Sequence, residues 1–201
     1  MIKHFLFFFS ILLLFTSLFA NERQITINKG KPVNVDGILE EGEWDDAGKI
    51  SIEITDRYSI TVYFKHDGEN LLFAFDGFLP EIFRVPEVML DIKNDRSPLM
   101  DDNDWWFHAS MTDCWSNGSF NDWKSCVRNA ESWKANNVID MKAENKFEME
   151  IPFKLIDLIL AESNTIGITF NATDTRSEWN FCPKHAQIAL PSSWSEAVIN
   201  K

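Results

Sequence analysis

Apolar and polar residues alternate along much of this 201-residue chain, and this period of two constrains the fold more than any other feature. The pattern is carried by residues 50–55, 60–64, 71–75, 147–151 and 166–170. Side chains of a strand point alternately to its two faces, so each segment predicts a half-buried β-strand. Residues 88–92 and 106–111 predict two further strands.

The strands are expected to pair in an antiparallel arrangement. Asp67-Gly68 separates two of the runs and predicts a tight hairpin turn. One short helix is predicted at residues 153–161, where apolar residues follow Pro152. Many short strands and a single helix predict an all-β fold, an antiparallel and jelly-roll-like β-sandwich. Residues 113–137 lack periodicity and predict a long Trp/Cys-containing loop.

The first 20 residues look like a secretory signal peptide. Lys3 precedes an apolar run over residues 5–15, and small and polar residues follow before Ala20. A membrane-spanning helix needs about 20 apolar residues, so the run favours a cleaved signal over a retained anchor, which stays the alternative. We therefore expect an exported protein, periplasmic or extracellular, with no stable membrane insertion. No linker or repeat divides residues 21–201, which predicts a single domain.

The charge of the mature chain restricts its partners. Without Lys3 it carries 18 basic and 31 acidic residues, a net charge near −13, which argues against nucleic acid and anionic membranes. Three cysteines in an exported chain predict one disulfide. Cys114 with Cys126 closes the shortest loop, although Cys182 could replace either. No C-x-x-C pair is present, so a thiolate metal site is not expected.

Tryptophan and aspartate concentrate in residues 101–133. This stretch holds five of the eight tryptophans and the acidic run Asp101-Asp102-Asn103-Asp104. Indole faces stack on the C–H patches of sugar rings, and carboxylates accept hydrogen bonds from hydroxyls. The composition predicts a recognition surface for saccharides.

The acidic residues of this part of the chain also suit a calcium ion. Oxygen ligands gathered from one loop are typical of Ca²⁺, although the spacing is not that of an EF-hand. Solvated turn residues are the alternative. The candidate ligands are Asp91, Asp95, Asp101, Asp102 and Asp104.

Two further segments carry a family resemblance. Residues 35–47 combine Asp36-Gly37 with Trp44 and Ala47, and residues 168–179 run from a predicted strand into a polar loop that ends in Trp179. With the Asp-rich strand-loop-strand, these motifs resemble family 9 carbohydrate-binding modules and their DOMON-like β-sandwich relatives. The resemblance spans residues 35–190 and implies the same sandwich. From its residue type, Trp44 is expected to be a core residue that covers one end of the sandwich.

The resemblance also implies a ligand site on the late strand. Asn171, Asp174 and Arg176 would bond sugar hydroxyls, and Trp179 would form one stacking wall. In the alternative, Arg176 pairs with Asp174 and Trp179 caps the sandwich. The second wall would be Trp105 or Trp106, because neighbours on a strand point to opposite faces.

These features predict a non-catalytic carbohydrate-binding protein that recognises a saccharide end or a short glycan. No histidine accompanies a G-x-S-x-G or similar nucleophile motif, and a glycoside-active enzyme is the weaker alternative. A haem-binding sandwich with ligands from Met89, His108, Met111 or Met141 is another alternative. A third is a cell-surface module that binds other proteins through its tryptophan loop.

Overall fold

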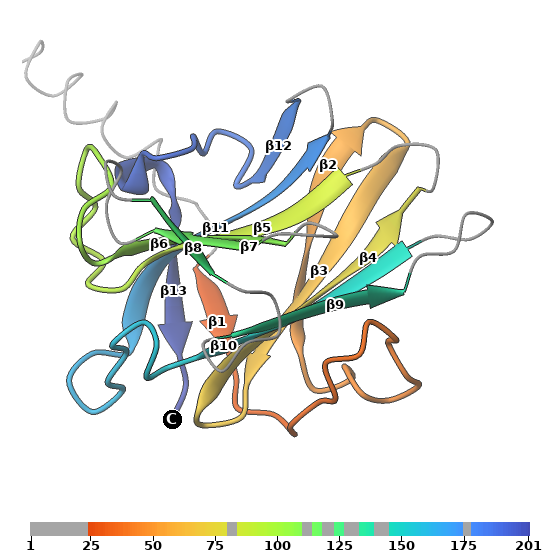
Figure 1. Ribbon diagram of the computed structural model, residues 1–201, viewed down its shortest axis with the longest axis horizontal. Helices are drawn as coiled ribbons and strands as arrows, with labels where there is room; N and C mark the ends of the chain where they lie inside the picture. The colour runs from red at the N-terminus through yellow and green to blue at the C-terminus, as the bar shows by residue number, and fades with distance from the viewer. Residues whose placement is uncertain are drawn as a thin grey trace, which may run out of the picture.

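The computed structural model describes residues 24–79, 84–109, 114–117, 123–126, 133–138, 145–174 and 178–201. Two β-sheets pack face to face, which confirms the predicted β-sandwich (Figure 1). Within these residues no helix is long and apolar enough to cross a membrane. The predicted signal peptide, residues 1–20, lies outside the described residues.

The larger sheet, sheet A, has eight strands. Their order is β1 (Ile25–Ile27), β13 (Ser195–Ile199), β11 (Thr165–Asp174), β5 (Arg84–Asp91), β6 (Asp104–Ala109), β7 (Cys114–Asn117) and β8 (Trp123–Cys126). The short strand β12 (Trp179–Cys182) pairs with the second half of β11. All neighbours are antiparallel except β1 and β13. The Trp/Cys-containing segment therefore includes two strands that continue sheet A.

Sheet B has five strands and contains the predicted hairpin. Its order is β2 (Gly48–Thr55), β3 (Tyr58–His66), β4 (Asn70–Phe78), β10 (Asn145–Pro152) and β9 (Lys134–Val138). The turn between β3 and β4 is fixed by the Asp67 carboxylate, which accepts hydrogen bonds from the backbone N–H of Glu69 and Asn70, both at 2.8 Å. Gly68 has φ +107°, a conformation that favours glycine.

Aromatic side chains from both sheets meet between them. Phe170 of β11 lies within 5.6–6.3 Å, centroid to centroid, of Phe64, Phe73 and Phe75 in sheet B. All four rings are buried. The alternation read from the sequence thus directs one face of each strand into a shared core.

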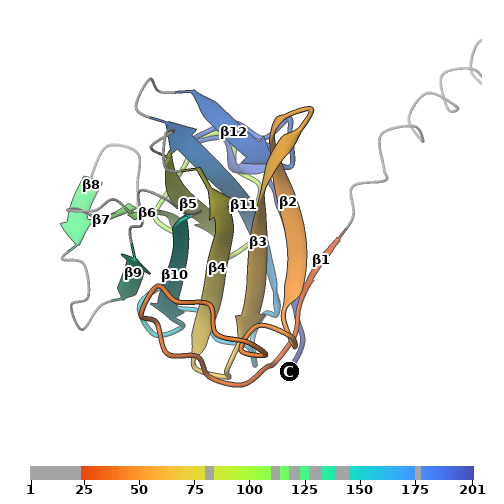
Figure 2. The same ribbon diagram turned by 90° about the vertical axis from the view of Figure 1, so that its right-hand side faces the viewer.

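The outer face of sheet B is covered by the segment before β2. Residues 28–47 run across the lower part of the sheet (Figure 2), and Trp44 packs there against Leu72. The buried Glu148 carboxylate accepts hydrogen bonds from the backbone N–H of Asp36 and Gly37 and from Trp44 Nε1, at 2.9–3.0 Å. Trp44 is buried, as predicted, in a small cluster outside sheet B.

The outer face of sheet A is partly covered by residues 183–194. Trp194 is buried there against Met89 and Met100, and its Nε1 donates to the Gln187 carbonyl at 3.0 Å. This segment contains a 3-10 turn, Pro191–Ser193. Met89, offered above as a haem ligand, fills this second cluster, while Met111 and Met141 lie outside the described residues.

The predicted helix at residues 153–161 is wrong. The segment forms turns, and Asp157 has φ +53°, a left-handed conformation that interrupts a right-handed helix. Within the described residues the only helical turn is Pro191–Ser193. The apolar residues instead close one end of the sandwich, with Phe153, Ile156 and Leu158 packed into the core.

Cys182 is a free thiol that lies half-buried on β12. Burial, with a contribution from the charge of Glu53, raises its pKa to about 11. The backbone of Cys114 stands directly opposite that of Cys126 in the β7–β8 pair. The predicted disulfide between these two cysteines stays a prediction, and the register is compatible with it.

Candidate functional site

A buried carboxylate organises the outer face of sheet A. Glu87 of β5 is fully buried, and the strand register places it between His108 of β6 and Asn171 of β11. Glu87 Oε1 bonds His108 Nδ1, and Oε2 accepts from Asn171 Nδ2 and, at 2.8 Å, from Thr173 Oγ1. Side chains from three neighbouring strands are therefore locked in one polar network.

Asn171 acts inside this network. It is fully buried, and its Oδ1 accepts a hydrogen bond from the backbone N–H of Asn180 at 2.9 Å. Both ends of its amide group are thus engaged within the protein. The bond to Asn180 helps attach β12 to β11, so Asn171 positions the residue before Asn180, Trp179.

Three aromatic rings, those of Trp106, Trp179 and Phe181, lie together on this face, and Trp179 is the most exposed of them. Its ring centroid lies 5.8 Å from that of Trp106 with an interplanar angle of 60°, and 6.2 Å from that of Phe181 with an angle of 8°. Trp179 remains 39% exposed, whereas Trp106 and Phe181 are half-buried and join the Trp194 cluster. The rings touch one another, so they form a supported platform rather than an open two-walled slot.

The structure separates the two tandem tryptophans, as the strand period predicts. Trp106 faces outwards beside Trp179. Trp105 faces the other way, stacks on Phe107 with centroids 5.9 Å apart, and packs against the main core. Only Trp106 therefore belongs to the surface that carries Trp179.

The remaining predicted ligand contacts are only partly described. The backbone of Asp174 ends β11, opposite Arg84 of β5 and next to the pair formed by Thr173 and Trp179. Arg176 lies outside the described residues. The sequence prediction thus placed three residues, Trp106, Asn171 and Trp179, on one region of sheet A.

Four members of the site were not predicted as saccharide contacts from the sequence: Glu87, His108, Thr173 and Phe181. Polar residues alternate with apolar ones at 87 and 173, and that pattern signals an outward direction. It does not reveal which outward residues become neighbours, because β5, β6 and β11 are joined only through the register of the sheet.

The acidic loop between β5 and β6 lies at the opposite end of these strands. Asp91 and Asp104 are register partners, and both are fully buried. Asp91 accepts hydrogen bonds from the backbone N–H of Asp95 and Arg96, at 3.3 and 2.9 Å, and Asp104 Oδ2 accepts from that of Asp101 at 2.7 Å. These carboxylates hold the backbone of their own loop.

One oxygen of this loop lacks a partner among the described residues: Asp104 Oδ1 is buried and accepts no hydrogen bond. Burial, together with the negative charges of Asp91 and Asp101, raises the pKa of Asp104 to about 7. Burial also raises the pKa of Asp91. Across the described residues no group of three or more His, Cys, Asp or Glu side chains is arranged to hold a metal ion. A calcium ion bound by the five predicted ligands stays a prediction.

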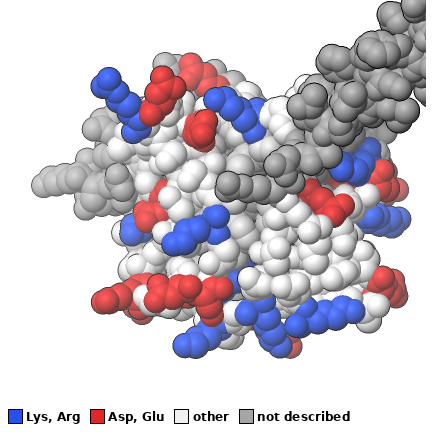
Figure 3. Space-filling view, turned by 180° about the vertical axis from the view of Figure 1, so that it is seen from behind, with Lys and Arg blue, Asp and Glu red and all other residues white. Residues whose placement is uncertain are grey.

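Side chains of both charge signs lie on the face of the molecule that Figure 3 shows. Acidic and basic side chains are interspersed on the face seen in Figure 3 and do not gather into one basic patch there.

Comparison with known proteins supports the fold. No family model and no curated protein sequence matches the chain. Among solved structures, a family 9 carbohydrate-binding module from Caldicellulosiruptor kristjanssonii in complex with cellotriose matches with a TM-score of 0.62 and 14% identity, covering 89% of this chain and 94% of that one. Its complex with glucose matches with a TM-score of 0.60 and 14% identity, over 89% and 96% of the two chains. The chain therefore has a fold like that of family 9 carbohydrate-binding modules.

Proposed function

We propose that this protein is exported and binds carbohydrate without catalysing a reaction, with Trp179 as its stacking platform. One observation carries the proposal: a 39% exposed indole is held on the outer face of sheet A by two other aromatic rings, beside a buried polar network. A rigid indole face suits the C–H patch of a sugar ring. The modules with this fold that are in complex with cellotriose and glucose support the same ligand class.

The polar network would supply the edge of the site. The His108 side chain is 24% exposed, and its Nδ1 is bonded to Glu87, so Nε2 is the ring nitrogen left to meet a hydroxyl. Asn171 would act indirectly, by holding β12 through Asn180. Asp174, at the end of β11, and the predicted ligand contact Arg176 would complete the polar edge.

The test is a titration of the protein with glucose and cellotriose, followed by tryptophan fluorescence and calorimetry. We expect Trp179→Ala to lower the affinity at least tenfold, about 1.4 kcal/mol, because the stacking surface is removed. Trp179→Phe should retain part of the affinity. Ile38→Ala is the control, because Ile38 is a 52% exposed apolar side chain on the segment that covers sheet B, away from the Trp179 platform.

Two results would reject this function. One is the absence of saccharide binding by the wild-type protein across a glycan array. The other is unchanged affinity in Trp179→Ala. Repeating the titration with a chelator present tests the predicted calcium ion, because a site that needs the ion should lose its affinity on chelation.

A further inference from the structure

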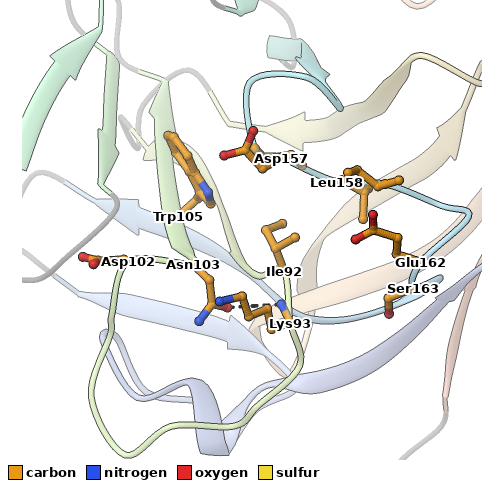
Figure 4. Close-up of a pocket in the computed structure, with 11 residues that line it drawn as sticks. Ile92, Lys93, Asp102, Asn103, Trp105, Asp157, Leu158, Glu162 and Ser163 are labelled. Atoms are coloured by element: carbon orange, nitrogen blue, oxygen red, sulfur yellow. Dashed lines mark hydrogen bonds between the residues drawn. The ribbon is translucent and has the colours of Figure 1, made fainter.

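A second concave site lies at the end of the sandwich where the predicted helix is replaced by turns. Its cavity, about 340 Å³, is enclosed by the segments that flank the β5–β6 loop and by the connection from β10 to β11 (Figure 4). It adjoins the start of β11, whereas Trp179 pairs with Thr173 near its end. At about 3.3 Å per residue the two places are about 25 Å apart along the strand.

The cavity combines an aromatic wall with an apolar floor. The half-buried indole of Trp105 forms one side, and Ile92, Ile156 and Leu158 lie at the base. Ile159, 52% exposed, extends the apolar surface to the rim. A volume of this size is at the lower end for small-ligand sites.

Two carboxylates are directed into this space. Figure 4 shows Asp157 and Glu162 turned towards the region between Trp105 and Leu158, whereas the carboxylate of Asp102 points away from it. Within the described part of the chain, Asp157 and Glu162 form no side-chain hydrogen bond or ion pair. Lys93 is the only basic residue of the lining, so the cavity is negatively charged.

This chemistry matches a sugar that carries a positive charge. The ring would stack on Trp105, and its ammonium group would lie near Asp157 and Glu162, where the indole face also attracts cations. Asn103 Oδ1 and Ser163 Oγ, both in the lining, each accept one backbone hydrogen bond and keep a lone pair that can accept from a sugar hydroxyl. A neutral sugar would gain no charge attraction from the two carboxylates, and a lysine side chain would be too slender to cover the indole and the floor together.

We propose that this cavity binds an amino sugar with a free amine. The site is independent of the Trp179 platform, because it is built from the other face of sheet A and from a different connection. The Trp179→Ala background therefore isolates it. If Trp179→Ala bound glucose and cellotriose as tightly as the wild type, the proposed function would fail while the cavity could still be tested. If glucosamine failed to bind the cavity, the test of the Trp179 platform would be unaffected.

The experiment compares D-glucosamine with glucose and N-acetylglucosamine in the Trp179→Ala background, at about pH 6, where the free amine is protonated. We expect glucosamine to bind at least tenfold more tightly than either neutral sugar. Asp157→Asn and Glu162→Gln should each weaken glucosamine binding about threefold to fivefold, as for partly exposed ion pairs. Asp157→Asn removes the charge without straining the backbone, because asparagine also tolerates the left-handed φ of +53° at this position.

Asp102→Asn is the matched control for charge, since it removes a carboxylate that points away from the cavity, and it should leave the affinity unchanged. Trp105→Ala should abolish glucosamine binding. The proposal is overturned if glucosamine and glucose bind equally, if the two carboxylate variants bind like the wild type, or if Nα-acetyl-lysine amide binds as tightly as glucosamine.

Discussion

At the scale of single residues, Asp104 is a carboxylate whose environment opposes its charge. One of its oxygens is buried without a partner among the residues that the structure describes, and its pKa is raised to about 7. The folded protein therefore holds a proton that the unfolded chain releases near its ordinary value of 3.8. The contribution of Asp104 to stability is complete below about pH 4 and is lost as the pH rises through 7.

We predict that Asp104→Asn stabilises the protein at alkaline pH. The amide carries no charge, keeps an oxygen for the Asp101 N–H, and places an N–H₂ donor near Asp91. The gain in unfolding free energy should be near zero at pH 4 and reach about 2–4 kcal/mol at pH 8 in a chelating buffer. Urea unfolding at several pH values measures it.

The exposed Asp102 provides the control for this prediction. Asp102→Asn should change the unfolding free energy little at any pH, because its side chain is hydrated in both states. A difference between Asp104→Asn and wild type that stays constant from pH 4 to pH 8 would contradict the raised pKa.

At the scale of elements, the β7–β8 pair gives the predicted disulfide a specific test. Directly opposite residues of an antiparallel pair have Cα atoms about 4.5 or 5.5 Å apart, within the range that a disulfide spans. Cys114 and Cys126 hold such positions, and Cys182 is a free thiol elsewhere on sheet A. A bridge would close a short loop and stabilise the hairpin by about 2–3 kcal/mol.

We expect one reactive thiol per chain in denaturant without reductant and three after reduction, counted by mass spectrometry of alkylated protein. In the native protein the remaining thiol should react about a hundredfold more slowly at pH 8 than an ordinary one, since its pKa is about 11 rather than 9.0. Three alkylated cysteines before reduction would exclude the disulfide. Cys182→Ser, which should leave none before reduction, assigns the free thiol.

The strands could be predicted from the sequence, whereas the turn at residues 153–161 and the contacts between distant strands could not. The core strands follow from alternation, because water on one face and core on the other impose a period of two. The helix prediction failed at Asp157, whose left-handed backbone cannot be recognised from the apolar residues around it. Asn171 was predicted as a ligand contact, but its amide bonds Glu87, 84 residues earlier in the chain. Contacts between non-local strands depend on register, which no local pattern specifies.

At the scale of the whole molecule, the two sheets should unfold as one unit because their aromatic side chains share a core. Phe170 makes three such contacts: it belongs to sheet A, and its ring neighbours Phe64, Phe73 and Phe75 all belong to sheet B. The covering segments 28–47 and 183–194 lie on the outer faces and cannot replace a ring lost from between the sheets.

Phe170→Ala should therefore lower the unfolding free energy by about 3–5 kcal/mol, through lost burial and the cavity left between the sheets. Leu99→Ala, at a side chain that is 68% exposed, should cost less than about 0.5 kcal/mol. Denaturation followed by far-UV circular dichroism and by tryptophan fluorescence should give coincident transitions in each variant. Separate transitions would mean that the two sheets are stable independently. A decrease in the unfolding free energy of less than about 1 kcal/mol in Phe170→Ala would mean that the core closes around the missing ring.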